Sequence, residues 1–190
     1  MLGVARKTVA TELDDATRVR AVRGDAEATR ALVELYQARV CALVSRMLSG
    51  RGRATVEDVA QDTFLAVFRR LAKFDPGGSA QLSTWILTIA ARRAIDELRR
   101  QRPTLVPEPD RAGEGRADDR AKRRELMGAI EGALRELTPE LRAAFLLREY
   151  HCLDYAEIAQ ALDIELGTVK SRLARARATL RERLAEVKHD

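Results

Sequence analysis

Residues 154–175 read DYAEIAQALDIELGTVKSRLAR, and this stretch decides how the C-terminal part of the chain folds. The small side chain of Ala159 lets two helices approach closely, and Ile164 can fill the corner between them. Along the second helix, apolar side chains recur at helical spacing, at Val169, Leu173, Ala176 and Leu180. A short helix, a tight turn and a second helix with one apolar stripe predict a helix-turn-helix.

The face of the second helix that lies away from this stripe is polar and basic. At about 100° per residue, hydroxyl and guanidinium side chains cluster there, and such groups can bond phosphates or reach guanine in the major groove. The predicted DNA contacts are Thr168, Lys170, Ser171, Arg172, Arg175 and Arg177. The alternative is a solvated basic helix in a bundle, but the preceding short helix and turn would then have to match by accident.

The overall composition favours helices packed on helices. Aromatic residues make up only 4% of the 190 residues, so we expect an all-α fold. Lys and Arg outnumber Asp and Glu by 34 to 29, and the resulting net charge of +5 permits a polyanionic partner without proving one.

No apolar run approaches the roughly 20 residues that span a bilayer, and the segment from Met1 to Leu13 lacks the apolar stretch of a signal peptide. We therefore expect a cytoplasmic protein. In that reducing compartment Cys41 and Cys152 are expected as buried thiols rather than as a disulfide. No second pair of ligands at metal spacing accompanies His151, so we expect no metal and no cofactor.

The chain divides into four stretches, which together predict two small helical domains joined by a flexible linker. Residues 1–14 show no clear period and are expected as a disordered arm. Residues 15–102 form the first domain. Residues 103–118 are rich in Pro, Gly and charge and have almost nothing to bury, which is typical of a linker. Residues 119–186 form the second domain and end in the helix-turn-helix.

Local signals place the helices within these domains. In the first domain we expect helices over 25–48, from Thr55 onward with Asp58 completing a capping-box-like pair, and over 83–102. In the second domain, Thr138 followed by Pro139 predicts another helix start.

Motifs in both domains resemble those of extracytoplasmic-function (ECF) sigma factors, which are promoter-specificity subunits of bacterial RNA polymerase. Residues 137–184 are similar to the fourth conserved sigma region, and 56–101 are similar to the second. The matching motifs are Pro139, Arg142, Phe145 and Gly167 to Arg177 in the former, and EDVAQDTF at 57–64, KFD at 73–75 and STWI at 83–86 in the latter. The linker stands where a third sigma domain is absent, as in the ECF group.

The resemblance implies three binding surfaces. In the family, the helix with the Asp-x-x-Gln motif docks on the clamp helices of the largest polymerase subunit, and the residues in question here are Asp58, Gln61, Asp62 and Leu65. The loop 74–82 and the following helix are similar to the element that captures unpaired bases of the −10 sequence. Its candidate contacts are Phe74, Ser79, Gln81, Ser83, Thr84, Trp85, Arg92 and Arg93. The helix-turn-helix is then expected to read the −35 element.

The expected function is therefore promoter recognition and strand opening, with core RNA polymerase and promoter DNA as partners. The resemblance also allows an anti-sigma factor as a further partner. The main alternative is a stand-alone regulator that binds an operator. An enzyme is a third class, with Glu57, Asp58 and Asp62 as metal or acid-base groups. It is not favoured, because these acids lack a His partner and point away from the apparent core.

Overall fold

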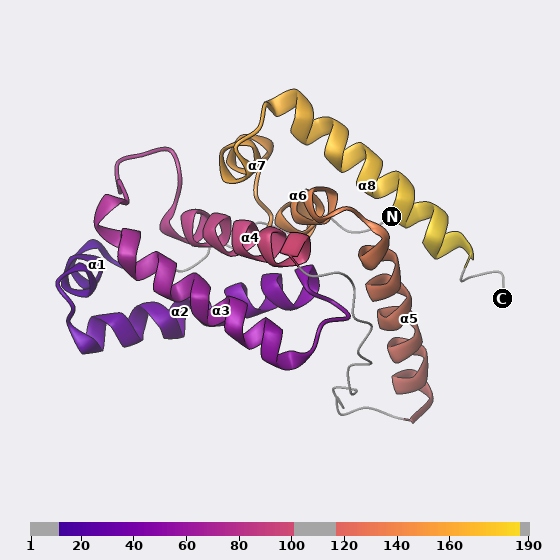
Figure 1. The fold of residues 1–190 in the computed structure, drawn as a ribbon, viewed down its shortest axis with the longest axis horizontal. Helices are drawn as coiled ribbons and strands as arrows, with labels where there is room; N and C mark the ends of the chain where they lie inside the picture. Colours follow the sequence, from indigo (N-terminus) through magenta and orange to yellow (C-terminus); the bar gives the residue numbers. More distant parts are fainter. Residues whose placement is uncertain (1–11, 101–116, 187–190) are drawn as a thin grey trace.

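The computed structural model of the protein describes residues 12–100 and 117–186, with no side chains described at 117–124 or at 186. All regular elements within these ranges are helical, which confirms the predicted fold class (Figure 1). The elements are α1 (Asp15–Val22), α2 (Ala26–Met47), α3 (Arg53–Arg70), η1 (Leu71–Lys73), α4 (Leu82–Arg100), α5 (Ala117–Glu136), α6 (Pro139–Glu149), α7 (Tyr155–Leu162) and α8 (Leu166–Glu186). The predicted linker lies almost entirely outside the described residues.

The N-terminal half is a bundle in which α2, α3 and α4 pack on one another and α1 packs on α2. The helix starts are set by local side chains, because Asp14 caps α1 and Asp25 caps α2. The predicted capping pair at Thr55 is wrong: α3 begins two residues earlier, at Arg53, with Gly52 as a cap that has no side chain to contribute. Helix α1 lies in a region where we predicted no separate helix.

Residues at the start of the described chain are tied into this bundle. One carboxylate oxygen of Glu12 accepts a hydrogen bond from the Tyr36 hydroxyl at 2.9 Å and another from the Ser83 backbone N–H at 3.1 Å. The backbone N–H of Leu13 in turn donates to the Tyr36 hydroxyl. Glu12 and Asp14, which we placed in a disordered arm, therefore both make contacts, and Glu12 satisfies a free amide at the N-terminus of α4.

The C-terminal half is built from α5, α6, α7 and α8, with α8 packed against all three others. The predicted start at Thr138 is confirmed, since its side chain accepts from the Leu141 N–H and Pro139 opens α6. Helix α7 begins with a reciprocal capping box between Asp154 and Glu157.

The two halves pack directly against each other. Helices α6 and α7 lie over α4, and α6 also contacts α2 (Figure 1). A single hydrophobic cluster has members from both halves. The two helical halves predicted on either side of the linker are thus in contact with each other in this structure.

Both cysteines are free thiols, as expected. Their predicted burial is only partly correct, because Cys41 is exposed on α2 while Cys152 is half-buried. Cys152 also has a φ of 56°, an uncommon backbone conformation for a residue other than glycine, in the turn before α7.

Candidate nucleic-acid interface

The predicted helix-turn-helix is formed by α7, a short turn and α8. Asp163 ends α7 in a left-handed conformation, with φ 55° and ψ 56°, and the Ile164 side chain packs against the core. The predicted apolar stripe of α8 is confirmed: its members are Val169, Leu173, Ala176 and Leu180, all buried. The stripe fixes the rotation of α8 about its axis and hence which side chains face outward.

The outward face of α8 carries most of the predicted −35 contacts. Lys170, Ser171 and Arg175 are exposed, whereas Thr168 and Arg172 are half-buried. The Ser171 hydroxyl donates to the Thr168 carbonyl at 3.0 Å. No acidic side chain in the described part of the chain forms an ion pair with the cations at 170, 172 or 175. Their charge is therefore available to phosphates.

Arg177 is placed differently from the other predicted −35 residues. It points back to α6, where its guanidinium donates to Glu149 at 2.7 Å and 3.2 Å. This hydrogen bond raises the pKa of Arg177. The structure therefore does not bring Arg177 together with Thr168 and Arg175 on one free face.

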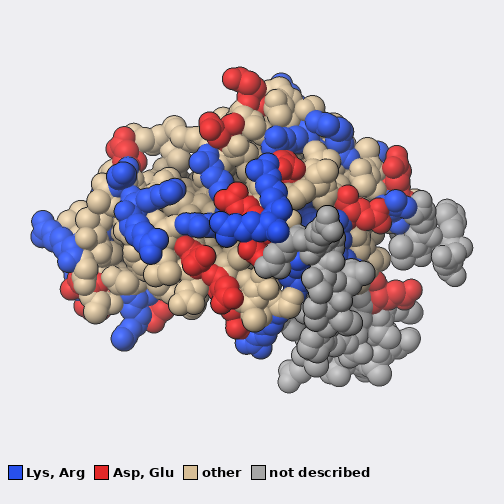
Figure 2. Space-filling model, in the orientation of Figure 1, with Lys and Arg blue, Asp and Glu red and all other residues tan. Residues whose placement is uncertain are grey.

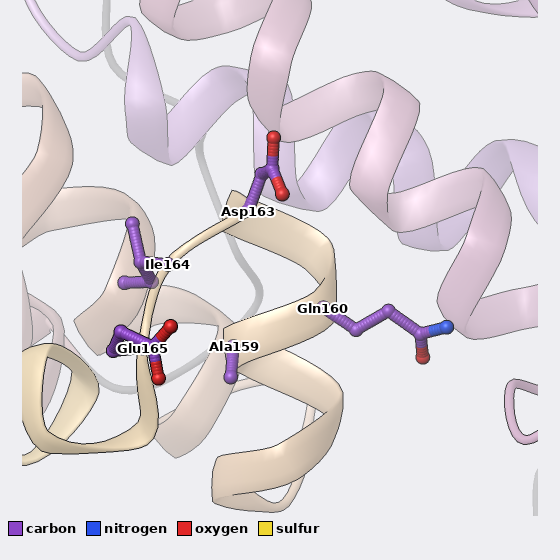
Figure 3. A pocket seen from close by; sticks show the side chains of 5 residues that line it. All are labelled: Ala159, Gln160, Asp163, Ile164 and Glu165. Atoms are coloured by element: carbon purple, nitrogen blue, oxygen red, sulfur yellow. The ribbon is translucent and has the colours of Figure 1, made fainter.

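An open hollow of about 430 Å³ lies at the turn between α7 and α8, lined by Ala159, Gln160, Asp163, Ile164 and Glu165 (Figure 3). Gln160 extends to one side of α7, away from Ile164 and Glu165. The lining offers carboxylates and one amide but no nucleophile paired with a base. In the described residues, no group of three or more His, Cys, Asp or Glu side chains is arranged to hold a metal ion.

The predicted −10 element is assembled around the loop before α4. The rings of Phe74 and Trp85 lie 5.5 Å apart, and the Arg18 guanidinium of α1 lies 5.9 Å from the Phe74 ring centre. Trp85 is half-buried against the core, and Ser79 and Gln81 in the loop are exposed. The aromatic pair thus anchors the loop, while its polar residues face outward.

Other predicted −10 residues lie on α4 and are less accessible. Ser83 and Thr84 are only 2% and 4% exposed. Arg92 is exposed and Arg93 half-buried. The Thr84 hydroxyl donates to the Glu157 carboxylate at 3.1 Å, so part of this element is in contact with α7. Burial of this kind was not anticipated for a surface expected to receive DNA.

The predicted polymerase-docking residues share one free face of α3. Asp58, Gln61 and Asp62 are exposed, and Leu65 is 44% exposed despite its apolar side chain. Val59, Ala60, Thr63, Ala66 and Val67 form the buried side of the helix. An exposed leucine among acids and an amide fits a protein-binding surface, and the docking role stays a prediction.

Two residues at the contact between the halves were not recognised from the sequence as structurally important. Arg142 is 4% exposed and donates to the carbonyls of Met47, Arg135 and Leu137, and burial lowers its pKa to about 10. The Nε2 atom of His151 is buried without a hydrogen-bond partner in the described structure. Neither the composition of the chain nor the spacing of its residues predicts that the Arg142 side chain and this His151 nitrogen are buried.

Charge is distributed over the molecule rather than collected in one patch on the face seen in Figure 2. Acidic and basic side chains alternate there. The net charge of +5 therefore says little about a partner, and the functional argument depends on the local, unpaired cations of α8.

These features define a helical nucleic-acid-binding protein with a helix-turn-helix in its C-terminal half. Comparison with known proteins carries the identification further. The chain matches the family Sigma-70 region 2 over residues 32–104 and the family Sigma-70, region 4 over residues 127–180. It belongs to the sigma-70 family, and within that family it is an RNA polymerase sigma factor of the ECF group.

Relatives and solved structures agree with this assignment. The ECF RNA polymerase sigma factor SigK of Mycolicibacterium vanbaalenii is 35% identical over 176 residues, which cover 87% of this chain and 85% of SigK. The ECF RNA polymerase sigma factor SigW of Bacillus subtilis is 29% identical over 184 residues, which cover 90% of this chain and 96% of SigW. In fold, the chain is similar to CnrH in its complex with the cytosolic domain of CnrY, with a TM-score of 0.67 at 24% identity over 90% of this chain and 96% of that chain. No helix within the described residues is long and apolar enough to cross a membrane.

Proposed function

We propose that this sigma factor acts through three separate surfaces and catalyses no covalent chemistry of its own. In this assignment α3 docks on the clamp helices of the largest polymerase subunit, the loop 74–82 with α4 captures the −10 element, and α8 reads the −35 element. The observation that carries the proposal is the order of matched regions, with region 2 on the half that contains α3 and α4 and region 4 on the half that contains α8. We further propose that the protein works in the cytoplasm, where its polymerase and promoters are.

The docking role of α3 is supported by the exposure of its acidic face. Asp58 and Asp62 lie one turn apart with Gln61 beside them and none is buried. A carboxylate and amide surface suits a partner helix that presents basic groups, and charge complementarity of this kind governs association rate and specificity. Leu65 adds an apolar anchor, 44% exposed, next to these charges.

The −35 role of α8 is supported by its unpaired cations and by its orientation. Arg172 and Arg175 come from adjacent turns on the side away from the buried stripe. Guanidinium groups in this position can contact guanine bidentately, whereas Ser171 and Thr168 can bond phosphates. Arg177 can contact DNA only after its bond with Glu149 is released.

A protein antagonist is a further proposed partner. The structure of RpoE from Bartonella quintana, which resembles this chain with a TM-score of 0.63 at 22% identity, is in complex with the anti-sigma factor NepR. That similarity establishes a shared fold, and the partner is inferred for this chain from its family. Binding of such an antagonist would have to compete with core polymerase or with promoter DNA.

The dependence of DNA binding on polymerase distinguishes a sigma factor from a stand-alone regulator. The measurement is fluorescence anisotropy of a labelled pool of genomic duplex fragments, titrated with the full chain in the presence and absence of purified core polymerase. The sigma assignment predicts weak binding by the chain alone and tight, sequence-selective binding once core is added. Tight selective binding by the chain alone, unchanged by core, would instead establish an operator-binding regulator.

A further inference from the structure

Residues 12–18, the N-terminal segment, lie outside the matched region 2, which begins at residue 32, yet they contact both ends of the loop 74–82. Helix α1, whose first turn belongs to this segment, also packs against η1, the helical turn that leads into the loop. Figure 1 shows α1 at the same end of the molecule as the loop between η1 and α4. The N-terminal segment is therefore next to the proposed −10 surface without being part of it.

At the end of the loop, the Glu12 carboxylate holds the first turn of α4. Its Oε2 atom accepts a hydrogen bond from the Ser83 N–H at 3.1 Å, one of the amides that a helix leaves free at its N-terminus. Gln81 precedes α4 and is not a residue type that commonly caps a helix with its side chain. Glu12 thus supplies, from a distant part of the chain, the acceptor that a local cap would supply, and a carboxylate at this position is also favoured by the helix dipole.

Tyr36 sets the position of this carboxylate. Tyr36 is 1% exposed on α2, and its hydroxyl donates to the same Glu12 oxygen at 2.9 Å. The Leu13 N–H donates to that hydroxyl at 3.0 Å, so the backbone of the segment is fixed as well. The other carboxylate oxygen of Glu12, Oε1, is buried and has no hydrogen-bond partner among the described residues. Both bonds therefore depend on one oxygen atom, and a substitution of Glu12 removes them together.

At the beginning of the loop, Arg18 packs on an aromatic pair. Its guanidinium lies 5.9 Å from the centre of the Phe74 ring, and its side chain is only 12% exposed. Asp15 orients this guanidinium through an ion pair at 3.1 Å. The Phe74 ring in turn lies 5.5 Å from the ring of Trp85, near the start of α4. Because a cation is attracted to an aromatic ring, Arg18 stabilises the ring pair that joins the two ends of the loop.

Between these ends, the tip of the loop is a short turn that is closed on itself. The Gly77 N–H donates to the Asp75 carboxylate at 2.9 Å, and the Gly78 N–H donates to the Asp75 carbonyl at 3.2 Å. These bonds fix the shape of the turn but not its direction. The direction in which Ser79 and Gln81 point therefore depends on how the two ends of the loop are held.

We propose that the N-terminal segment increases the protein's discrimination between −10 sequences, with Glu12 and Arg18 as positioning residues that act through the loop 74–82 and do not touch DNA. The inference rests on the proposed role of the loop and α4 in −10 capture, and it adds a contribution from outside the matched region 2. Because the loop is held in one geometry before DNA arrives, it cannot move to accommodate a wrong base. Loss of the Glu12 contacts should therefore reduce discrimination at the −10 element while polymerase binding is retained.

A pair of carboxylate deletions separates this role from a general effect on stability. Glu12→Ala removes both bonds to the carboxylate. Asp25→Ala is the matched control, because Asp25 caps α2 in the same half and contacts Ala28 and Arg20 rather than the loop or α4. Each chain is assembled with core polymerase, and fluorescence anisotropy measures binding of the holoenzyme to a single-stranded non-template oligonucleotide. One oligonucleotide carries the −10 sequence of a promoter selected with the wild-type holoenzyme, and a second carries the same bases in permuted order.

The expected result for Glu12→Ala is a loss of about fivefold in the ratio of the two affinities, which is the factor that one hydrogen bond typically contributes to an equilibrium, with co-purification with core polymerase unchanged to within about twofold. Asp25→Ala should keep the wild-type ratio. An unchanged ratio for Glu12→Ala, or equal losses for both variants, would overturn the inference. A wild-type holoenzyme that binds both oligonucleotides equally would instead overturn the proposed −10 role of the loop.

Tyr36→Phe tests the same contact without deleting the carboxylate. It keeps the buried ring and removes only the hydroxyl that orients Glu12. The affinity ratio should fall in the same direction, and adding this change to Glu12→Ala should cause no further loss, since both act through one carboxylate. Additive losses in the double variant would show that Tyr36 does not act through Glu12 and would contradict the proposed network.

Trp85 reports the positions of the loop ends directly, because it is the only tryptophan of the chain. Arg18→Met keeps an aliphatic side chain against Phe74 and removes the charge. In the free protein, acrylamide should quench Trp85 fluorescence more strongly in Glu12→Ala and in Arg18→Met than in the wild type, whereas Asp25→Ala should match the wild type. Equal quenching in all four proteins would overturn the proposed positioning.

Discussion

Acidification is expected to destabilise the protein through His151, which lies in the turn after α6, at the contact with α2. Burial lowers the pKa of His151 to about 4 from its ordinary value of 6.5, and the nearby cations Arg39 and Arg46 act in the same direction. The imidazole is therefore neutral in the folded protein at pH values where the unfolded chain would already be protonated. A base whose pKa is depressed by folding stabilises the fold fully above its unfolded pKa, and this contribution is lost as the pH falls toward the folded pKa.

The magnitude follows from the two pKa values. Between pH 7 and pH 5 the unfolded state takes up most of a proton at this site while the folded state takes up almost none, so the free energy of unfolding should fall by about 2 kcal/mol. Below about pH 4 the loss should level off, since both states are then protonated. The assay is urea denaturation followed by circular dichroism at each pH, in constant ionic strength.

His151→Gln is the matched variant, because glutamine is of similar length and never becomes charged. All other titratable groups are common to the two proteins, so the difference between the two pH profiles isolates His151. The wild type should lose about 2 kcal/mol more than the variant over this interval. Parallel profiles for the two proteins would refute the assignment of a buried, neutral imidazole.

Three further predictions concern the proposed surfaces. Asp58→Lys combined with Gln61→Ala should weaken co-purification with core polymerase and leave the circular dichroism spectrum unchanged, because both side chains are exposed; retained binding would exclude docking through α3. Arg172→Ala and Arg175→Ala should each cost about 1 to 3 kcal/mol of discrimination at the −35 element when binding of the holoenzyme to promoters is measured. Arg181→Ala should have a much smaller effect on sequence preference in this assay. Equal losses of binding on every promoter for all three variants would contradict base reading. Changing the promoter spacer by two base pairs should abolish run-off transcription, while adding a few Gly-Ser residues to the linker should reduce it only modestly; equal tolerance of both changes would favour independently searching domains.

Much of the local structure could be predicted because the relevant signals are local. The N-cap at Thr138 with Pro139 after it, and the apolar stripe from Val169 to Leu180, depend on bonds and packing within a few turns of helix. The start of α3 was predicted two residues too late because the prediction depended on a local capping side chain. Gly52 has no side chain to signal a cap, while the nearby threonine resembled one.

The packing of region 4 on region 2 could not be predicted from these patterns. Thr84, Arg92 and Gln160 are polar side chains whose periodicity is equally compatible with water, DNA or another helix. The residues in contact are also far apart in the sequence, since Arg92 and Ala161 are separated by 69 positions. The burial of Arg142 could not be predicted from the sequence either, since arginine is usually exposed. Its partners are carbonyls near helix ends, at Met47, Arg135 and Leu137, which no sequence pattern identifies.

Run-off transcription from a genomic library measures whether this chain gives core RNA polymerase its promoter specificity. Purified core polymerase is supplied with the wild-type chain or with no addition, and the 5′ ends of the transcripts are mapped. A sigma factor should produce discrete start sites that appear only with the chain and share sequence elements at the −10 and −35 positions. Identical transcripts with and without the chain would contradict it.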